Sequence, residues 1–407
     1  MPGMQSIALG IWIKTGGRYE NQENKGIAHF LEHLIFKGSK KYSCRRIKES
    51  IEGKGGSLNG FTSEELTCYF AKLPRKHLDL ALDVLSDMVV NPELKQQEID
   101  KERTVIIEEI KMYKDLPQSH VYELLDELLW PGQPLGMSIA GTIESVSRIG
   151  RKEMAAFKNK YYNTTGIVIS AAGMLDHDEL SGKAKELFSG FKKTKPNAFV
   201  KARQKQGKPQ LNLSVKDTEQ THLALGFHGI RRGHPLKYAL GLLHIILGAN
   251  MSSRLFNELR EKRGLVYEIG SQAKRYLDTG AFIVHAGVDN RKVEEVVPLI
   301  LKELKRIKDN PVTKDEFKRA KDFYLGQLML ALEDTLDHMS WIGESTASLD
   351  KTYSLEEVIS NMEKVKIGDI TEAARQIFNE NSLNLALIGP LKGRQENIEQ
   401  CLFRSHL

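Results

Sequence analysis

The predicted order of helices and strands occurs twice along the chain, and this repetition restricts the possible folds more than any other feature. An apolar, β-branched strand at residues 7–13 precedes the first copy. Apolar spacing then predicts the first copy as a helix, a helix, two strands and a helix at residues 26–36, 43–51, 57–62, 65–73 and 75–90. The second copy follows two strands, at residues 211–215 and 221–227, and comprises residues 236–247, a helix ending at Gly264, 268–273, 280–286 and 293–307. We therefore predict an internal duplication that gives an α+β fold, with two homologous domains and one sheet in each.

The length of the chain also favours two domains, because 407 residues exceed what one hydrophobic core usually serves. The stretch from about residue 192 to residue 208 is rich in lysine and contains proline and glycine, which is typical of a linker. We predict an N-terminal domain at residues 1–195, a linker at 196–208 and a C-terminal domain at 209–407.

The composition excludes several classes of protein. Hydrophobic residues make up 41% of the chain and charged residues 28%, and no run approaches 18 uninterrupted apolar residues, so we expect no membrane span. The net charge of +6 comes from scattered basic residues without a binding motif, so nucleic acid is not an expected partner. Cys44, Cys68 and Cys401 are far apart, and the first residues lack a secretory signal. These features predict a cytoplasmic protein.

The most informative segment is His29-Phe30-Leu31-Glu32-His33, inside the helix predicted at residues 26–36. Residues four apart lie on one face of a helix, so His29 and His33 can direct two imidazole nitrogens at one metal ion. Glu32 can reach a water held on that ion. This order is the inverted zinc-peptidase signature, in which the carboxylate serves as general base. The segment predicts a catalytic zinc site.

A catalytic zinc ion usually takes a third protein ligand, and the helix predicted at about residues 94–114 offers carboxylates for it. Its apolar stripe includes Ile106 and Ile110. Glu102 and Glu109 lie two turns apart along one edge of this stripe, whereas Glu108 points toward solvent. The helical spacing therefore favours Glu102 or Glu109 over Glu108, and it does not choose between these two.

Several motifs together resemble the pitrilysin/insulinase family of zinc metallopeptidases. They are His29-Phe30-Leu31-Glu32-His33 with Phe36-Lys37-Gly38, and Glu102-Arg103 with Glu108-Glu109-Ile110. Within the family, the chain resembles the single-unit branch that includes the β-subunit of the mitochondrial processing peptidase and its bacterial relatives. The resemblance implies one zinc ion per chain on His29, His33 and Glu109, with Glu102 assisting catalysis from behind the ligands. It also implies that the two domains, each a mostly antiparallel sheet covered by helices, form half of a clamshell.

The resemblance extends to residues that would contact a peptide substrate. Residues 55–63 resemble the family's substrate-binding edge strand, and Asn59 and Gly60 map onto residues that grip the substrate backbone, although alanine is common at the position of Gly60. Arg260 and Tyr267 map onto an arginine and a tyrosine that polarise the substrate carbonyl. Without the resemblance, residues 55–63 suit a hairpin turn equally well. Arg260 and Tyr267 equally suit a helix end with ordinary surface charges.

The predicted C-terminal domain contains a lone histidine, His244, where the N-terminal domain has its metal motif, so we expect it to be metal-free. The resemblance implies that its Arg260 and Tyr267 complete the site of a partner subunit. A homodimer is the simplest expectation, because this chain carries both sets of residues, and a heterodimer is the other arrangement that the family uses.

These observations predict a zinc-dependent endopeptidase that cleaves unfolded peptides or short protein segments in an enclosed chamber, with Glu32 acting on a zinc-bound water. The alternative is a non-catalytic presequence-binding or structural subunit of a larger assembly. Relatives of that kind usually have a degraded metal motif, whereas the motif of this chain is intact.

Overall fold

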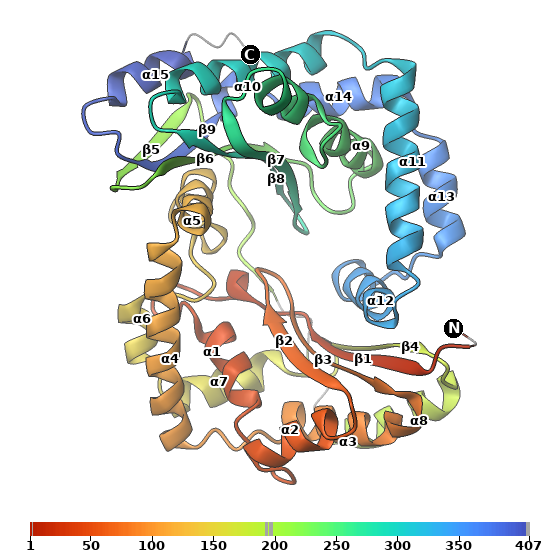
Figure 1. Ribbon diagram of the computed structural model, residues 1–407. Coiled ribbons are helices and arrows are strands. Elements are labelled where there is room, and N and C mark those ends of the chain that lie inside the picture. The colour runs from red at the N-terminus through yellow and green to blue at the C-terminus, as the bar shows by residue number, and fades with distance from the viewer. Residues whose placement is uncertain (2, 192–193, 195–197, 404–407) are drawn as a thin grey trace. The chain divides into compact units, whose positions relative to one another are not determined.

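The computed structural model describes residues 1, 3–191, 194 and 198–403, and these form two compact units, each with one β-sheet (Figure 1). Neither unit is contiguous in sequence. Unit 1 contains residues 1–111, 137–200 and 329–353, and unit 2 contains residues 112–136, 201–328 and 354–407.

Unit 1 contains a four-stranded antiparallel sheet in the order β2-β3-β1-β4. Its strands are β1 (Ser6–Ile13), β2 (Ser57–Thr62), β3 (Thr67–Pro74) and β4 (Ile167–Gly173). Its helices are α1 (Ile27–Ile35), α2 (Cys44–Glu52), α3 (Leu78–Val90), α6 (Ile143–Arg148), α7 (Arg151–Tyr161), α8 (His177–Leu187) and α12 (Thr335–Leu349), with most of α4 (Gln96–Asp115). The strand β2 is thus at one edge of the sheet.

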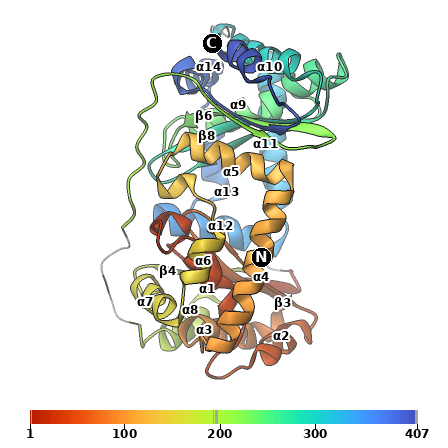
Figure 2. The ribbon, with the colours of Figure 1, turned by 90° about the vertical axis from the view of Figure 1, so that its left-hand side faces the viewer.

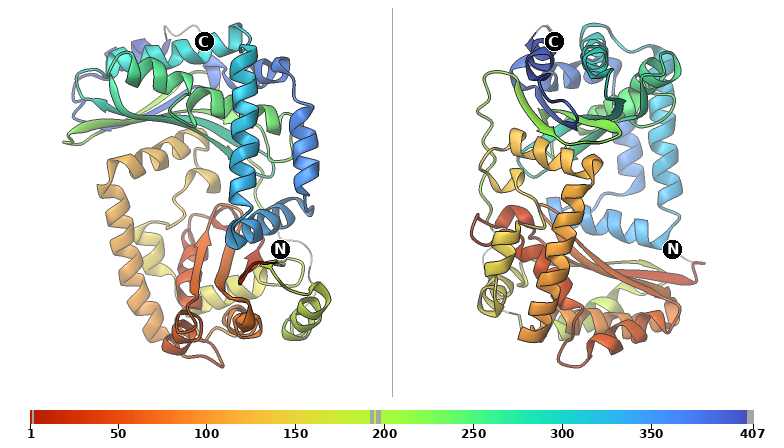
Figure 3. Two further views of the ribbon diagram at one scale, coloured as in Figure 1. Left: turned by 45° about the vertical axis from the view of Figure 1, so that its right-hand side comes forward. Right: turned by 60° about the vertical axis from the view of Figure 1, so that its left-hand side comes forward.

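Both faces of this sheet are apolar. Side chains alternate along β1, so successive residues of this strand lie on opposite faces. Ile7, Leu9 and Ile11 pack into the core that α1 and α3 cover, whereas Ala8 and Trp12 face the smaller cluster under α12. The helix α12 lies against β1 and β4 (Figure 1, Figure 3). Burial on both faces explains why the sequence of β1 is apolar from Ile7 to Ile13.

Unit 2 contains a five-stranded sheet in the order β5-β9-β6-β8-β7, in which β5 is parallel to β9 and the other neighbours are antiparallel. Its strands are β5 (Gln210–Val215), β6 (Gln220–Gly229), β7 (Val266–Arg275), β8 (Gly280–Asp289) and β9 (Asn384–Gly389). Its helices are α5 (Pro117–Leu129), α9 (Lys237–Gly248), a π-helix (Phe256–Glu261), α10 (Val293–Asp309), α13 (Leu355–Glu363), α14 (Ile367–Ile377) and α15 (Gln395–Phe403), with most of α11 (Lys314–Ala331). The helices α9, α10 and α14 contribute to the core on one face, and α5 packs on the other face, beside β6 (Figure 2).

The two sheets share one plan. Strands β2, β3, β1 and β4 of unit 1 correspond in order to β7, β8, β6 and β9 of unit 2, where β5 is added at the outer edge of β9. This agreement confirms the predicted α+β class with two sheets, each packed by helices.

The predicted contiguous boundaries differ from the compact units in two segments. Residues 112–136 belong to unit 2 and residues 329–353 to unit 1, because each supplies the helix that covers the second apolar face of a sheet. Unit 1 gives way to unit 2 between Val200 and Lys201, inside the predicted linker. Residues 196 and 197 of that linker lie outside the described residues.

Within the described part of the chain, none of the helices combines the length and the apolar character needed to cross a bilayer.

Candidate metal centre

The helix α1 carries both histidines of the inverted motif. Phe30, Leu31 and Leu34 are fully buried and fix this helix against the core of unit 1. His29 and His33 therefore lie on the opposite side, one turn apart, with their ring centroids 4.7 Å from each other. Their spacing follows directly from the helical repeat.

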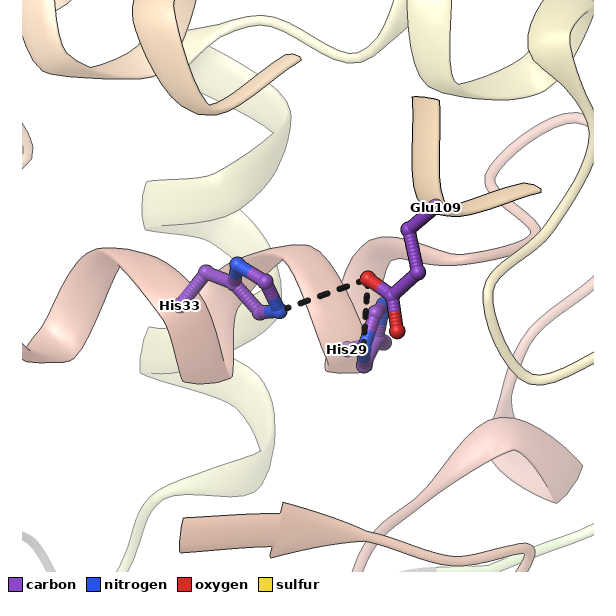
Figure 4. Close-up of side chains that lie close together, drawn as sticks. All are labelled: His29, His33 and Glu109. Carbon is purple, nitrogen blue, oxygen red and sulfur yellow. Dashed lines mark ion pairs between the residues drawn. The ribbon is translucent and has the colours of Figure 1, made fainter. Parts of the chain in front are cut away.

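The helix α4 brings a carboxylate to these two imidazoles. Glu109 Oε2 lies 3.7 Å from His29 Nε2 and 3.7 Å from His33 Nε2. Figure 4 shows both rings turned toward this carboxylate. The three residues each offer one ligand atom, and these atoms all lie within 4.8 Å of one another. Glu108 is exposed and pairs with Lys111 instead, as its helical position predicts.

This arrangement fits a zinc ion. Two imidazole nitrogens and one carboxylate oxygen are a common ligand set of catalytic zinc, which holds each ligand atom at about 2.0–2.2 Å. Ligand atoms on one tetrahedral ion then lie about 3.4 Å apart, so the two 3.7 Å separations from Glu109 are close to this value. Burial and the neighbouring His33 lower the pKa of His29 to about 4. The imidazole of His29 is therefore neutral at pH 7, as a metal ligand must be.

Glu102 lies behind the ligands rather than among them. Its Oε2 atom is 3.1 Å from His33 Nδ1, and its Oε1 atom is 2.5 Å from Lys37 Nζ. A hydrogen bond to the remote nitrogen fixes the orientation and tautomer of a ligating imidazole. The structure therefore separates the two carboxylates that helical spacing had left equivalent: Glu109 approaches Nε2 of both histidines, and Glu102 holds Nδ1 of His33.

Glu32 lies on α1 and is almost entirely buried. Its Oε2 atom accepts a hydrogen bond of 2.8 Å from the Thr62 hydroxyl at the end of β2. Burial raises the pKa of Glu32, while the Thr62 hydrogen bond and the nearby His33 act in the opposite direction. A raised pKa suits a carboxylate that accepts and returns a proton.

The predicted substrate residues Asn59 and Gly60 lie in β2, at the edge of the unit 1 sheet. Asn59 is exposed, and its Oδ1 atom accepts a hydrogen bond from the Gly60 backbone N–H. A Cβ atom at position 60 would lie 3.1 Å from the ring of Phe36 and 3.1 Å from Cys68 O. This tight space explains why glycine suits the position here.

Arg260 and Tyr267 lie together in unit 2. Arg260 is on the π-helix, and its guanidinium carbon is 5.4 Å from the centre of the Tyr267 ring. Tyr267, in β7, is 72% exposed. Both side chains are thus accessible from solvent within their own unit. His244, in the same unit, is half-buried, and its Nδ1 atom lies at hydrogen-bond distance, 2.8 Å, from Ser271 Oγ.

Sequence reasoning missed two residues that contact the site, Lys37 and Thr62. Lys37 follows His33 by four residues, so it lies near the same face just beyond the end of α1. Thr62 follows Gly60 by two residues in β2 and shares its face. Both spacings can be read from the sequence. Their meaning follows only from the structure, in which Lys37 contacts Glu102 and Thr62 contacts Glu32.

Comparison with known proteins gives matches over nearly the whole chain. Residues 2–143 match the family model described as "Insulinase (Peptidase family M16)", and residues 148–324 match "Peptidase M16 inactive domain". An uncharacterized zinc protease of Bacillus subtilis is 37% identical, over 96% of this chain and 94% of its own length. Another, from Streptomyces coelicolor, is 34% identical over 97% of this chain and 87% of its own length.

Solved structures share the fold. A protease from Helicobacter pylori has a TM-score of 0.89 at 24% identity, over 95% of this chain and 94% of that chain. A Pseudomonas fluorescens structure, titled as a peptidase M16 inactive domain, has a TM-score of 0.86 at 20% identity with the same coverage, 95% and 94%.

Proposed function

The chain belongs to the insulinase (peptidase M16) family, and on this premise we propose that it is a zinc-dependent endopeptidase that cleaves unfolded peptides or short protein segments. The observation that carries the proposal is the approach of Glu109 to the Nε2 atoms of both His29 and His33, with Glu32 on the same helix. These three residues would hold one zinc ion per chain.

A zinc ion bound there would lower the pKa of water toward about 7 and would polarise a substrate carbonyl. Glu32 accepts the proton of the attacking water and returns it to the leaving amine. Its burial and its hydrogen bond from Thr62 hold the carboxylate in one orientation for this transfer. Glu102 keeps His33 in the ligating orientation through Nδ1, and Lys37 neutralises the charge of Glu102.

The substrate binds in extended form along β2, whose outer edge offers backbone groups for pairing. Asn59 and Gly60 grip its main chain. Arg260 and Tyr267 donate hydrogen bonds to the carbonyl oxygen as negative charge develops on it. The protein acts as a homodimer, with Arg260 and Tyr267 of one subunit completing the site of the other around an enclosed chamber. The family resemblance supports these assignments.

The substitution Glu32→Gln tests the catalytic assignment. It keeps the volume of the side chain and removes the base, so we expect peptide turnover to fall by about 10²–10⁴-fold, while the zinc content of the purified protein stays near that of the wild type. The matched control is Glu108→Gln on α4, which removes an exposed carboxylate beside Glu109 and should change neither quantity. Full peptidase activity in the Glu32→Gln protein would refute the proposal.

Digestion of a mixed peptide library, with and without a chelator, distinguishes the peptidase from a non-catalytic subunit. A zinc-dependent peptidase cleaves the library, loses activity when the metal is removed and recovers it when zinc is restored. A structural or presequence-binding subunit leaves the library intact and contains much less than one zinc ion per chain.

A further inference from the structure

The first turn of α1 carries His29, and this turn is held by a residue outside the helix. The helix has Gly26 as its N-cap, in the left-handed region at φ 93°, so the cap residue has no side-chain oxygen to accept the free backbone N–H groups. Glu20 supplies both acceptors. Its Oε2 atom accepts a hydrogen bond of 3.0 Å from Gly26 N, and its Oε1 atom accepts one of 2.8 Å from Ala28 N.

We propose that Glu20, together with Lys25, is a positioning residue for the metal ligand His29. This inference rests on the proposed zinc site. A carboxylate at the start of a helix also complements the helix dipole, and loss of a capping side chain typically frays the first turn. His29 is the third residue of α1, so fraying of that turn displaces its imidazole from Glu109.

The two histidines differ in how they are held. His33 Nδ1 is 3.1 Å from Glu102 Oε2, and Glu102 is paired in turn with Lys37. His29 Nδ1 is buried, and it has no hydrogen-bond partner among the residues that the structure describes. No side chain in that part of the protein therefore fixes the His29 ring through its second nitrogen. Its placement depends on the backbone of the first turn, which Glu20 holds.

The surroundings of Glu20 favour a role in geometry over a role in stability. The Lys25 ammonium lies 3.2 Å from Glu20 Oε2 and donates to Gly17 O at 3.0 Å, and the two side chains are 0% (Glu20) and 4% (Lys25) exposed. A buried ion pair contributes little net stability, because removing both charges from water offsets their attraction. A pair that contributes little net stability, and that contacts the turn bearing a metal ligand, fits a positioning role.

Residues other than Glu20 also restrain the turn. Ser145 Oγ donates a hydrogen bond of 2.7 Å to Lys25 O. A Cβ atom at Gly26 would lie 2.6 Å from Ala140 O, so only glycine allows this approach to the neighbouring segment. These contacts restrain the residues just before α1. Glu20 connects these residues to the first turn of the helix through its hydrogen bonds from Gly26 N and Ala28 N.

The test compares Glu20→Gln with Glu23→Gln, an exposed glutamate of the same loop. Glutamine offers one acceptor oxygen where Glu20 has two, and its amide group faces a backbone N–H. We expect Glu20→Gln to weaken zinc binding about 10–100-fold, the usual cost of losing an outer contact of a metal site, in chelator competition. The visible spectrum of the cobalt-substituted protein should also change, because it reports ligand geometry. Glu23→Gln should match the wild type in both measurements.

Circular dichroism shows whether each variant is folded. If Glu20→Gln does not fold, the double variant Glu20→Gln/Lys25→Met, which removes both buried charges, is measured in the same way with the same expectation. A folded Glu20 variant with wild-type zinc affinity and an unchanged cobalt spectrum would overturn the inference. Failure of the wild type to bind zinc would instead overturn the proposed function, so the two results are distinguishable.

Discussion

The contact between α12 and β1 allows a stability prediction at Gly343. This glycine lies directly over Trp12, which is 1% exposed and donates a hydrogen bond of 2.8 Å to Ser170 Oγ. A Cβ atom at position 343 would overlap Nε1 and Cε2 of Trp12 and would lie 2.5 Å from Ser170 Oγ. The substitution Gly343→Ala therefore cannot be accommodated without moving α12 or turning the indole ring.

The size of the effect follows from three contributions. Overpacking a filled core costs about 1–3 kcal/mol, and leaving the Trp12 N–H or the Ser170 hydroxyl unpaired costs about 1–3 kcal/mol. Alanine regains about 1 kcal/mol of helix propensity relative to glycine. We expect a net loss of about 3 kcal/mol, which lowers the melting temperature of a unit of this size by about 6–12 °C.

Scanning calorimetry measures this change, with the two units treated as separate transitions if they unfold separately. The matched control is Gly326→Ala on α11, where an added Cβ meets nothing within 4 Å. That substitution should raise stability by about 0.5–1 kcal/mol through helix propensity alone. A Gly343→Ala protein as stable as the Gly326→Ala protein would show that α12 is not packed against Trp12 as described.

Two further predictions concern charged contacts. Lys37→Met removes the cation beside Glu102 and should weaken zinc binding about 10-fold in chelator competition, with Lys40→Met, a nearby exposed lysine, as the control; equal affinities would contradict the role given to Lys37. In unit 2, hydrogen bonds from Arg254 lower the pKa of Glu316 to about 2. Because this folded-state pKa is below the ordinary value of 4.5, the stabilisation is complete above about pH 4.5 and is lost as the pH falls through about 2. Glu316→Gln should therefore cost about 2 kcal/mol at pH 7 in urea unfolding and progressively less toward pH 2, and a cost that is independent of pH would refute the reasoning.

Local sequence signals predicted the elements around the metal centre. The helices α1 and α2 and the strands β2 and β3 follow from apolar spacing and from glycine or serine boundaries. Each signal acts within a few residues, so it can be read without knowledge of tertiary structure. The candidate ligands on α1 are one turn apart for the same reason.

Contacts between segments far apart in the sequence could not be predicted from local patterns. Strand β9 lies between β5 and β6 in the unit 2 sheet, and its pairing partners are more than 150 residues away in the sequence. The choice between Glu102 and Glu109 depended on how far α4 extends past α1, which helical spacing alone does not contain. The capping role of Glu20 could not be predicted, because the N-cap residue is a glycine and the capping side chain comes from outside the helix.

The helix α12 belongs to unit 1 but comes late in the sequence, and this order has a consequence for synthesis on the ribosome. When residue 200 has emerged, β1 and β4 are complete, but the helix that covers Trp12 and Ala172 is not yet made. At about 5–20 residues per second, roughly 8–30 seconds pass before residue 350 emerges in turn. During that interval the nascent chain presents an uncovered apolar sheet face, the kind of surface that chaperones recognise.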